Sequence, residues 1–182
     1  MTFEKTVTLK DGRNCLLRNG VTSDGKAVLD VFNRTHEETD YLLTYSDENC
    51  FTASQEADFL QRKTDSANNV EIIAVVDDVV AGTAGIDALG MRDKIKHRAV
   101  FGIAITKEFW GLGIGKYLME ACIECAREAG YLQLELEVVA GNERAVEMYK
   151  RAGFIEYGRN PKAFRLRTGE YQELIDMRLE LK

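Results

Sequence analysis

Proline and histidine are scarce in this chain, and long apolar runs are absent. Among 182 residues there is one proline, Pro161, and there are two histidines, His36 and His97. No repeat, low-complexity tract or linker divides the chain, so we expect a single domain over residues 1–182. No segment approaches the roughly 18 apolar residues of a membrane span, and the first ten residues, MTFEKTVTLK, lack an apolar run of signal-peptide length. These absences predict a cytoplasmic protein with no membrane partner.

The small number of metal-binding side chains argues against a metal site. Four cysteines are present, and Cys122 and Cys125 form a CxxC pair inside the helical run MEACIECAREA. A zinc site would need a second pair of ligands, and two separated histidines do not supply it. We therefore expect both cysteines to be small buried helix residues and no metal to be bound.

The charge balance argues against nucleic acid as a partner. The formal net charge is −6, and the excess of acidic side chains lies in residues 1–90, which carry 16 acidic and 8 basic side chains. Residues 91–182 carry 14 acidic and 16 basic side chains. A duplex-binding surface is not expected on this total, whereas the split suggests that the second half of the chain faces an anion.

The periodicity of apolar residues predicts a mixed α/β (α+β) fold. Strands and helices do not alternate regularly, which favours a mixed sheet with helices packed on it over a repeating βα array. The expected elements are a hairpin of residues 3–9 and 13–18, helices over 23–45 and 54–64, two strands within 71–86 joined at Asp77-Asp78, a strand over 98–106, a long helix after it, a strand over 132–139, a helix over 142–154 and a last strand over 172–181.

Three glycines at alternate positions mark the start of the long helix, in the stretch ITKEFWGLGIGKYLME. The first amides of a helix lack intrahelical partners, and the helix dipole adds partial positive charge there. Gly111, Gly113 and Gly115 leave that backbone bare, and Lys116 adds a cation. The pattern predicts a diphosphate-binding loop, since a tight turn without a ligand would need only one glycine.

Two other types of phosphate-binding loop fit this stretch less well. A nucleoside-triphosphate loop fails, because Trp110 stands where its first glycine belongs and Tyr117 follows the lysine. A dinucleotide loop of an oxidoreductase has some support, because Glu135 or Glu137 lies at about the expected distance for a ribose-binding acid. Its third glycine would be one place early, and that interpretation leaves residues 142–154 unexplained.

The glycine loop and residues 142–154 together resemble the GNAT superfamily of acyl-coenzyme-A-dependent N-acetyltransferases. The family pattern is Q/R-x-x-G-x-G/A at a helix start, then a strand and N-x-x-A-x-x-x-Y-x-x-x-G-F. This chain has WGLGIGKYLM followed by LELEVVAGNERAVEMYKRAGF, with Trp110 in place of the usual Gln or Arg. The match covers roughly residues 70–160. It implies a mostly antiparallel central sheet flanked by helices, and acetyl-CoA as the co-substrate.

The resemblance also implies roles for particular residues. Tyr149 would protonate the leaving thiolate, and the Asn142 side chain, which also caps a helix, would reach the pantetheine arm. The implied coenzyme-binding residues are Ile103, Ala104, Ile105, Gly111, Leu112, Gly113, Ile114, Gly115, Lys116, Asn142 and Tyr149. The implied reaction is direct transfer of acetyl from acetyl-CoA to a primary amine in a ternary complex.

The sequence leaves the general base and the acceptor open. His97, Glu135, Glu137 and a water chain are all candidates for the base. The stretch THEETDYLLTYSDEN carries acids and tyrosines that suit a cationic amine, so a small amine or amino acid is favoured as acceptor. A protein N-terminus or lysine remains an alternative, as does a non-catalytic acyl-CoA sensor.

The basic segment GRNPKAFRLRTG precedes the last strand and is expected to form a hairpin. Its cations either guard a sheet edge or reach the ribose phosphate of the coenzyme. The last strand also leaves a homodimer open.

Overall fold

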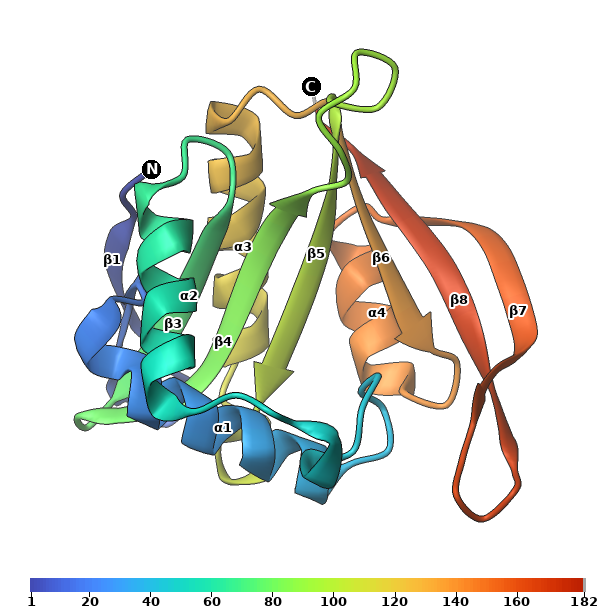
Figure 1. The fold of residues 1–182 in the computed structure, drawn as a ribbon, viewed down its shortest axis with the longest axis horizontal. Helices are drawn as coiled ribbons and strands as arrows, with labels where there is room; N and C mark the ends of the chain where they lie inside the picture. Colours follow the sequence, from blue (N-terminus) through green and yellow to red (C-terminus); the bar gives the residue numbers. More distant parts are fainter. Residues whose placement is uncertain (182) are drawn as a thin grey trace.

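The computed structural model describes residues 1–181, so Lys182, the last residue of the predicted domain, lies outside the described residues. Its strands form one sheet in the order β1-β2-β3-β4-β5-β6-β8-β7 (Figure 1). The strands are β1 (Glu4–Thr8), β2 (Asn14–Asn19), β3 (Val70–Val76), β4 (Val79–Ala88), β5 (Arg98–Ile105), β6 (Gln133–Val139), β7 (Ile155–Arg165) and β8 (Tyr171–Glu180). The helices are α1 (Gly25–Glu38), α2 (Ala53–Asp65), α3 (Ile114–Glu128) and α4 (Glu143–Arg151).

Every neighbouring pair of strands is antiparallel except β5 and β6, which run parallel. The mixed, mostly antiparallel sheet that the sequence predicted is therefore confirmed. The tight turn at Asp77-Asp78 is confirmed as well, because both residues have positive φ, 49° and 64°. Two successive left-handed residues give the turn whose twist matches that of a hairpin.

Helices cover both faces of the sheet, with α1 and α2 in front and α3 and α4 behind in the view of Figure 1. Alternation along β3 explains how one strand serves both layers. Ile72 and Ala74 are buried in the large core that contains α3 and α4, whereas Ile73 packs with Val28 of α1 and Leu60 of α2. Successive side chains of a strand point to opposite faces, so both layers are anchored on the same short segment.

The helix predicted over residues 23–45 is confirmed as far as Glu38 and is wrong over its last seven residues. Helix α1 ends at Glu38, and Thr39 is extended, with φ −156° and ψ 148°. Residues 39–52, which we call the strap, connect α1 to α2 and contain only a short 3₁₀ turn at Ser46–Glu48. The strap carries the apolar residues Tyr41, Leu42 and Leu43, which extended the helical pattern in the sequence without being part of the helix.

The hairpin expected over the basic segment is confirmed, because this segment forms β7 and the turn that leads into β8. Strand β7 covers much of the basic segment and lies at the edge of the sheet, paired with β8. Its register shifts at Glu156/Gly158 and again at Asn160/Phe164, so two bulges break the alternation by which a strand is recognised. The edge position agrees with the interpretation that the basic side chains protect an unpaired strand.

Strands β5 and β6 pair only at their first residues. Arg98, Ala99 and Val100 pair with Gln133, Glu135 and the residue between them. Beyond Val100, β5 continues to Ile105 along β4, and β6 continues to Val139 along β8. Beyond Val100 the two strands are therefore no longer paired, and we call the space between them the wedge. Within residues 1–181 no helix is both long and apolar enough to cross a bilayer.

Candidate functional site

A cavity of about 1050 Å³ opens in the wedge between β5 and β6. Its walls come from the end of β5 with the loop that follows it, the first turns of α3, the end of β6, α4, the strap, and the pair β7–β8, with single residues added by Lys10 and Thr35. A volume of this size accommodates a large ligand. Because the parallel ladder ends at Val100, the facing edges of β5 and β6 are available to a ligand over the length of the wedge.

The glycine loop lies at one end of this cavity. Gly111 and Gly113 have φ of +88° and +96°, and a β-carbon on Gly111 would meet nothing within 4 Å. Gly113 is the N-cap of α3, so the free amides of the first helical turn face the cavity end. The open space and the left-handed backbone fit a phosphate cradle, as predicted from the sequence.

Gly115 has a different role from the other two glycines. It lies inside α3, and a β-carbon there would come 3.1 Å from Met148 Sδ and 3.3 Å from Ile105 Cδ1. Its lack of a side chain therefore allows α3 to approach α4 and β5 closely. The three glycines serve two purposes, a bare cradle and a tight helix contact.

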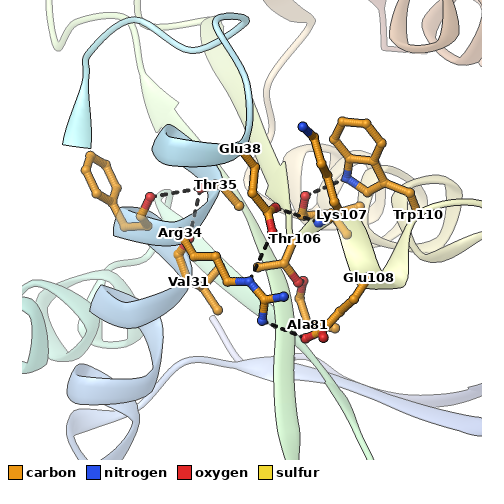
Figure 2. Close-up of polar contacts among 11 residues, drawn as sticks. Val31, Arg34, Thr35, Glu38, Ala81, Thr106, Lys107, Glu108 and Trp110 are labelled. Carbon is orange, nitrogen blue, oxygen red and sulfur yellow. Dashed lines mark hydrogen bonds and ion pairs between the residues drawn. The ribbon is translucent and has the colours of Figure 1, made fainter.

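The loop between β5 and α3 is fastened to α1 (Figure 2). The Glu38 carboxylate accepts a hydrogen bond of 2.6 Å from the Lys107 amide, and Arg34 forms an ion pair of 2.8 Å with Glu108. The Trp110 indole N–H donates to the Ile105 carbonyl at 2.6 Å. These contacts fix the loop relative to both α1 and the end of β5.

Two residues of the second motif also face the cavity. The Asn142 side chain accepts a hydrogen bond from the Ala145 amide at 3.3 Å, which is an N-cap of α4. Tyr149 is 6% exposed and packs against Phe101 and Phe154, with ring centroids 6.1 and 5.8 Å away. Burial raises the pKa of the Tyr149 phenol above its ordinary value of 10.0. The phenol therefore keeps its proton at neutral pH and is a hydrogen donor at the cavity wall.

The three candidate bases lie in different surroundings. His97 precedes β5 and does not line the cavity. Glu135 is buried and bound to Arg98, with Arg98 Nη2 donating to Glu135 Oε2 at 2.7 Å. Glu137 is exposed, lines the cavity, and has no ion-pair partner among residues 1–181. Of these three, only Glu137 has a carboxylate in the cavity and available to a ligand.

The strap is fastened across the other end of the cavity to the turn between β7 and β8. The Arg167 guanidinium makes two hydrogen bonds to the Asp47 carboxylate, at 2.8 and 3.0 Å, and stacks 4.1 Å above the Tyr45 ring. The Arg167 amide also donates to the Tyr45 hydroxyl at 3.0 Å. We call this set of contacts the latch. It holds Thr39, Tyr41, Leu42 and Leu43 of the strap at the cavity wall.

Ten of the eleven residues named from the sequence line the cavity together, and Leu112 does not. The Leu112 side chain packs against the large core and its carbonyl accepts the Lys10 amide at 3.2 Å. The strap residues at the wall lie within the stretch proposed from the sequence for the acceptor, whereas Phe164 of β7 and Leu174 of β8 were not predicted. No motif marks them, because they meet only through the β7–β8 pairing and the latch.

The cysteines are placed as expected for structural residues. Cys122 and Cys125 are free and buried on α3, where burial raises the pKa of the Cys125 thiol to about 12. No group of three or more His, Cys, Asp or Glu side chains within residues 1–181 is arranged to hold a metal ion.

Comparisons with known proteins agree with this site. A family model described as the acetyltransferase (GNAT) family matches residues 30–154. The L-amino acid N-acetyltransferase AaaT of Escherichia coli (strain K12) is 32% identical over 118 residues, which are 64% of this chain and 72% of that protein.

Solved structures share the fold over nearly the whole chain. An acetyltransferase of the GNAT family from Streptococcus pneumoniae superposes with a TM-score of 0.87 at 27% identity, covering 91% of this chain and 99% of that one. The structure of yncA from Salmonella typhimurium, described with its cofactor acetyl-CoA, gives a TM-score of 0.82 at 16% identity, covering 93% and 95%.

Proposed function

The chain belongs to the acetyltransferase (GNAT) family, and from this premise we propose that it transfers the acetyl group of acetyl-CoA to the amino group of a small amine or amino acid. The observation that carries the proposal is the wedge cavity, where the glycine loop, Tyr149 and Glu137 line one space. The similarity to an L-amino acid N-acetyltransferase supports an amino-group acceptor.

The α3 end of the cavity fits the anionic part of acetyl-CoA. Amides from Gly111 to Gly115 would bind its pyrophosphate, and the open space at Gly111 leaves room for it. Among the described residues, the cavity wall carries four cations on the α3 and α4 side, Lys10, Lys116, Arg144 and Arg151, together with the acids Glu120 and Glu147. Lys10 reaches the loop directly, because its Cε lies 3.9 Å from the position of a β-carbon on Gly113.

The free edge of β5 fits the extended arm of the coenzyme. Ile103, Ala104 and Ile105 would bind it through backbone groups, as an added strand is bound. The co-substrate supplies a thioester carbonyl, and a backbone amide of this edge would stabilise negative charge on its oxygen. The Ile105 carbonyl already accepts the Trp110 indole N–H, so binding there would have to share that acceptor.

Two side chains would handle the protons of the reaction. Glu137 would take a proton from the acceptor ammonium, directly or through water, because an amine attacks only when it is neutral. Tyr149 would donate its proton to the departing thiolate, since burial keeps the phenol protonated. No cysteine is among the described residues of the cavity wall, which supports direct transfer without an acetyl-enzyme.

The experiment that tests the proposal measures thiol release from acetyl-CoA with a panel of amines and amino acids. Release that depends on an acceptor supports the transferase. Thermal stabilisation by acetyl-CoA without release from any acceptor would favour the non-catalytic sensor instead.

Replacing Glu137 tests the assignment of the base. We expect Glu137→Gln to lower kcat by about 10²-fold or more at neutral pH, because general base catalysis typically contributes 10²–10⁴-fold. The loss should shrink as the pH approaches the pKa of the acceptor amine, which then supplies its own neutral form. Glu135→Gln is no suitable control, since it removes the partner of Arg98, so Glu124→Gln, an exposed change on α3, is the control. A loss of the same size at every pH would contradict the assignment.

A further inference from the structure

The cavity has two chemically different sides. The side formed by α3 and α4, with Lys10 of the β1–β2 turn, carries four cations and the helix amides, together with the acids Glu120 and Glu147. The opposite side faces the layer of α1 and α2, and it is lined by the strap and by one face of β6, β8 and β7 (Figure 1). The proposed function assigns the first side to acetyl-CoA, which leaves the second side for the acceptor.

Apolar side chains dominate the acceptor side. Leu42 and Leu43 come from the strap, Phe164 from β7 and Leu174 from β8. Leu174 pairs with Val139 in the β6–β8 register, two residues along from the Glu137–Asp176 pair, so Leu174 and Glu137 share a face of the sheet. Leu174 is 6% exposed, whereas Leu43 is 80% exposed at the cavity wall. An apolar group bound there would cover the Leu43 side chain.

Glu137 is the only charged side chain that the described residues place on this side of the cavity wall. Its strand neighbour Asp176 adds a second negative charge directly opposite it. A cationic amino group would be stabilised at this point, while a carboxylate on the acceptor would meet the Glu137 carboxylate and, among the described wall residues of this side, no basic partner. Burying an unpaired charge is unfavourable, so the site discriminates against a free carboxylate.

We infer that the acceptor is an amine that carries an apolar group near its amino group and has no free carboxylate. The inference rests on the proposed function and narrows it. The ammonium group approaches Glu137, the apolar group contacts Leu42, Leu43, Phe164 and Leu174, and the carboxyl, where one is present, is blocked as an amide. The latch contributes by holding two of these leucines against the cavity before the acceptor arrives.

Three acceptors of similar size test this inference in the thiol-release assay: L-leucinamide, L-asparaginamide and L-leucine. L-Asparaginamide replaces the apolar side chain with a polar one of similar shape, and L-leucine restores the carboxylate. We expect L-leucinamide to have a kcat/KM roughly tenfold or more above each of the others, the scale of discrimination that apolar pockets reach. Equal or better turnover of L-asparaginamide or L-leucine would overturn the inference.

Variants of the strap test whether Leu42 and Leu43 cause the preference for an apolar acceptor. Leu42→Ser and Leu43→Ser should lower the ratio of kcat/KM for L-leucinamide over L-asparaginamide, without raising the KM for acetyl-CoA. Leu132→Ser, a change at an exposed leucine outside the cavity wall, should leave the ratio unchanged. A ratio that survives both strap substitutions would overturn the assignment. If acetyl-CoA raises the melting temperature and none of a wider amine panel releases thiol, the proposed transfer fails, and the acceptor inference fails with it.

Discussion

Tyr149 is a buried phenol that packs against the rings of Phe101 and Phe154 and lines the cavity. We predict that Tyr149→Phe lowers kcat by about 10²-fold or more and leaves acetyl-CoA binding nearly unchanged, because the ring is kept and only the proton donor is lost. Burial raises the pKa of this phenol, so the donor stays protonated as the pH rises. The ratio of wild-type to variant kcat should therefore stay constant from about pH 7 to about pH 9.5.

The measurement is a pair of pH–rate profiles under saturating acetyl-CoA, with coenzyme affinity determined by calorimetry. A variant that keeps full activity at every pH would remove Tyr149 from the reaction. A ratio that collapses before pH 9 would show instead that the phenol ionises in the neutral to mildly alkaline range.

Trp110 departs from the family pattern, and its indole has a defined contact. The N–H donates to the Ile105 carbonyl at 2.6 Å, and the ring lies 5.8 Å from Lys107 Nζ and 5.6 Å from Arg144 Cζ. Trp110→Phe keeps an aromatic ring and removes the donor. A typical hydrogen bond contributes about 1 kcal/mol, which corresponds to about a fivefold change in affinity. Because this bond holds the glycine loop against the end of β5, we expect its loss to raise the KM for acetyl-CoA by up to about that factor with kcat preserved. A change in kcat alone would contradict this role.

At the scale of elements, the latch of Arg167 with Asp47 and Tyr45 holds the strap in its position. Arg167→Asp should free the strap from the β7–β8 turn and raise the acceptor KM several-fold, since exposed ion pairs contribute up to about 1 kcal/mol each and the Tyr45 stacking is lost as well. The KM for acetyl-CoA should not change, because the glycine loop is fastened separately to α1.

Exchanging the two charges distinguishes positioning of the strap by the ion pair from a general loss of protein stability. Combining Arg167→Asp with Asp47→Arg restores the ion pair in reverse, so the acceptor KM should return at least partly toward the wild-type value. Steady-state kinetics of the two single variants and the double variant measure this. A double variant no better than the worse single variant would show that the ion pair does not position the strap.

The elements predicted well from sequence are those whose pattern is local. The turn at Asp77-Asp78, the glycine-led start of α3 and the Asn142 cap of α4 all depend on residues next to one another. Strand β7 was predicted only as part of a hairpin, without its bounds, because Gly158, Pro161 and two bulges interrupt its alternation and its strand structure comes from pairing with β8. The helix was predicted to include the first residues of the strap because their apolar side chains continue the pattern of α1, whereas in the fold Leu42 and Leu43 line the cavity together with Phe164 of β7 and Leu174 of β8.

At the scale of the whole molecule, the wedge separates two kinds of chemistry. Pairing of β5 with β6 stops after three residues, and no local sequence pattern predicts where a parallel ladder ends. That split places the cations of α3 and α4 behind the sheet and the strap in front of it (Figure 1). The candidate coenzyme residues could be predicted from motifs, whereas the acceptor side arises only from the tertiary fold.

The fold also contains a partly buried acid outside the cavity, Glu71, whose pKa predicts how stability depends on pH. Glu71 of β3 faces Lys63 and Glu56 of α2 and Thr83 and Asp87 of β4, and burial raises the pKa of its carboxyl from 4.5 to about 7. The favourable contribution of the neutral carboxyl is fully present below pH 4.5 and is lost as the pH rises through about 7. Glu71→Gln stays neutral at every pH. Its effect on the free energy of unfolding should therefore be more stabilising at pH 8 than at pH 5, by about 1–3 kcal/mol. This range includes a reduction for partial screening of the carboxylate by solvent. Urea unfolding of wild type, Glu71→Gln and the exposed control Glu124→Gln at both pH values measures this. An equal effect of Glu71→Gln at pH 5 and pH 8 would show that the carboxyl is already ionised in the folded protein across that range.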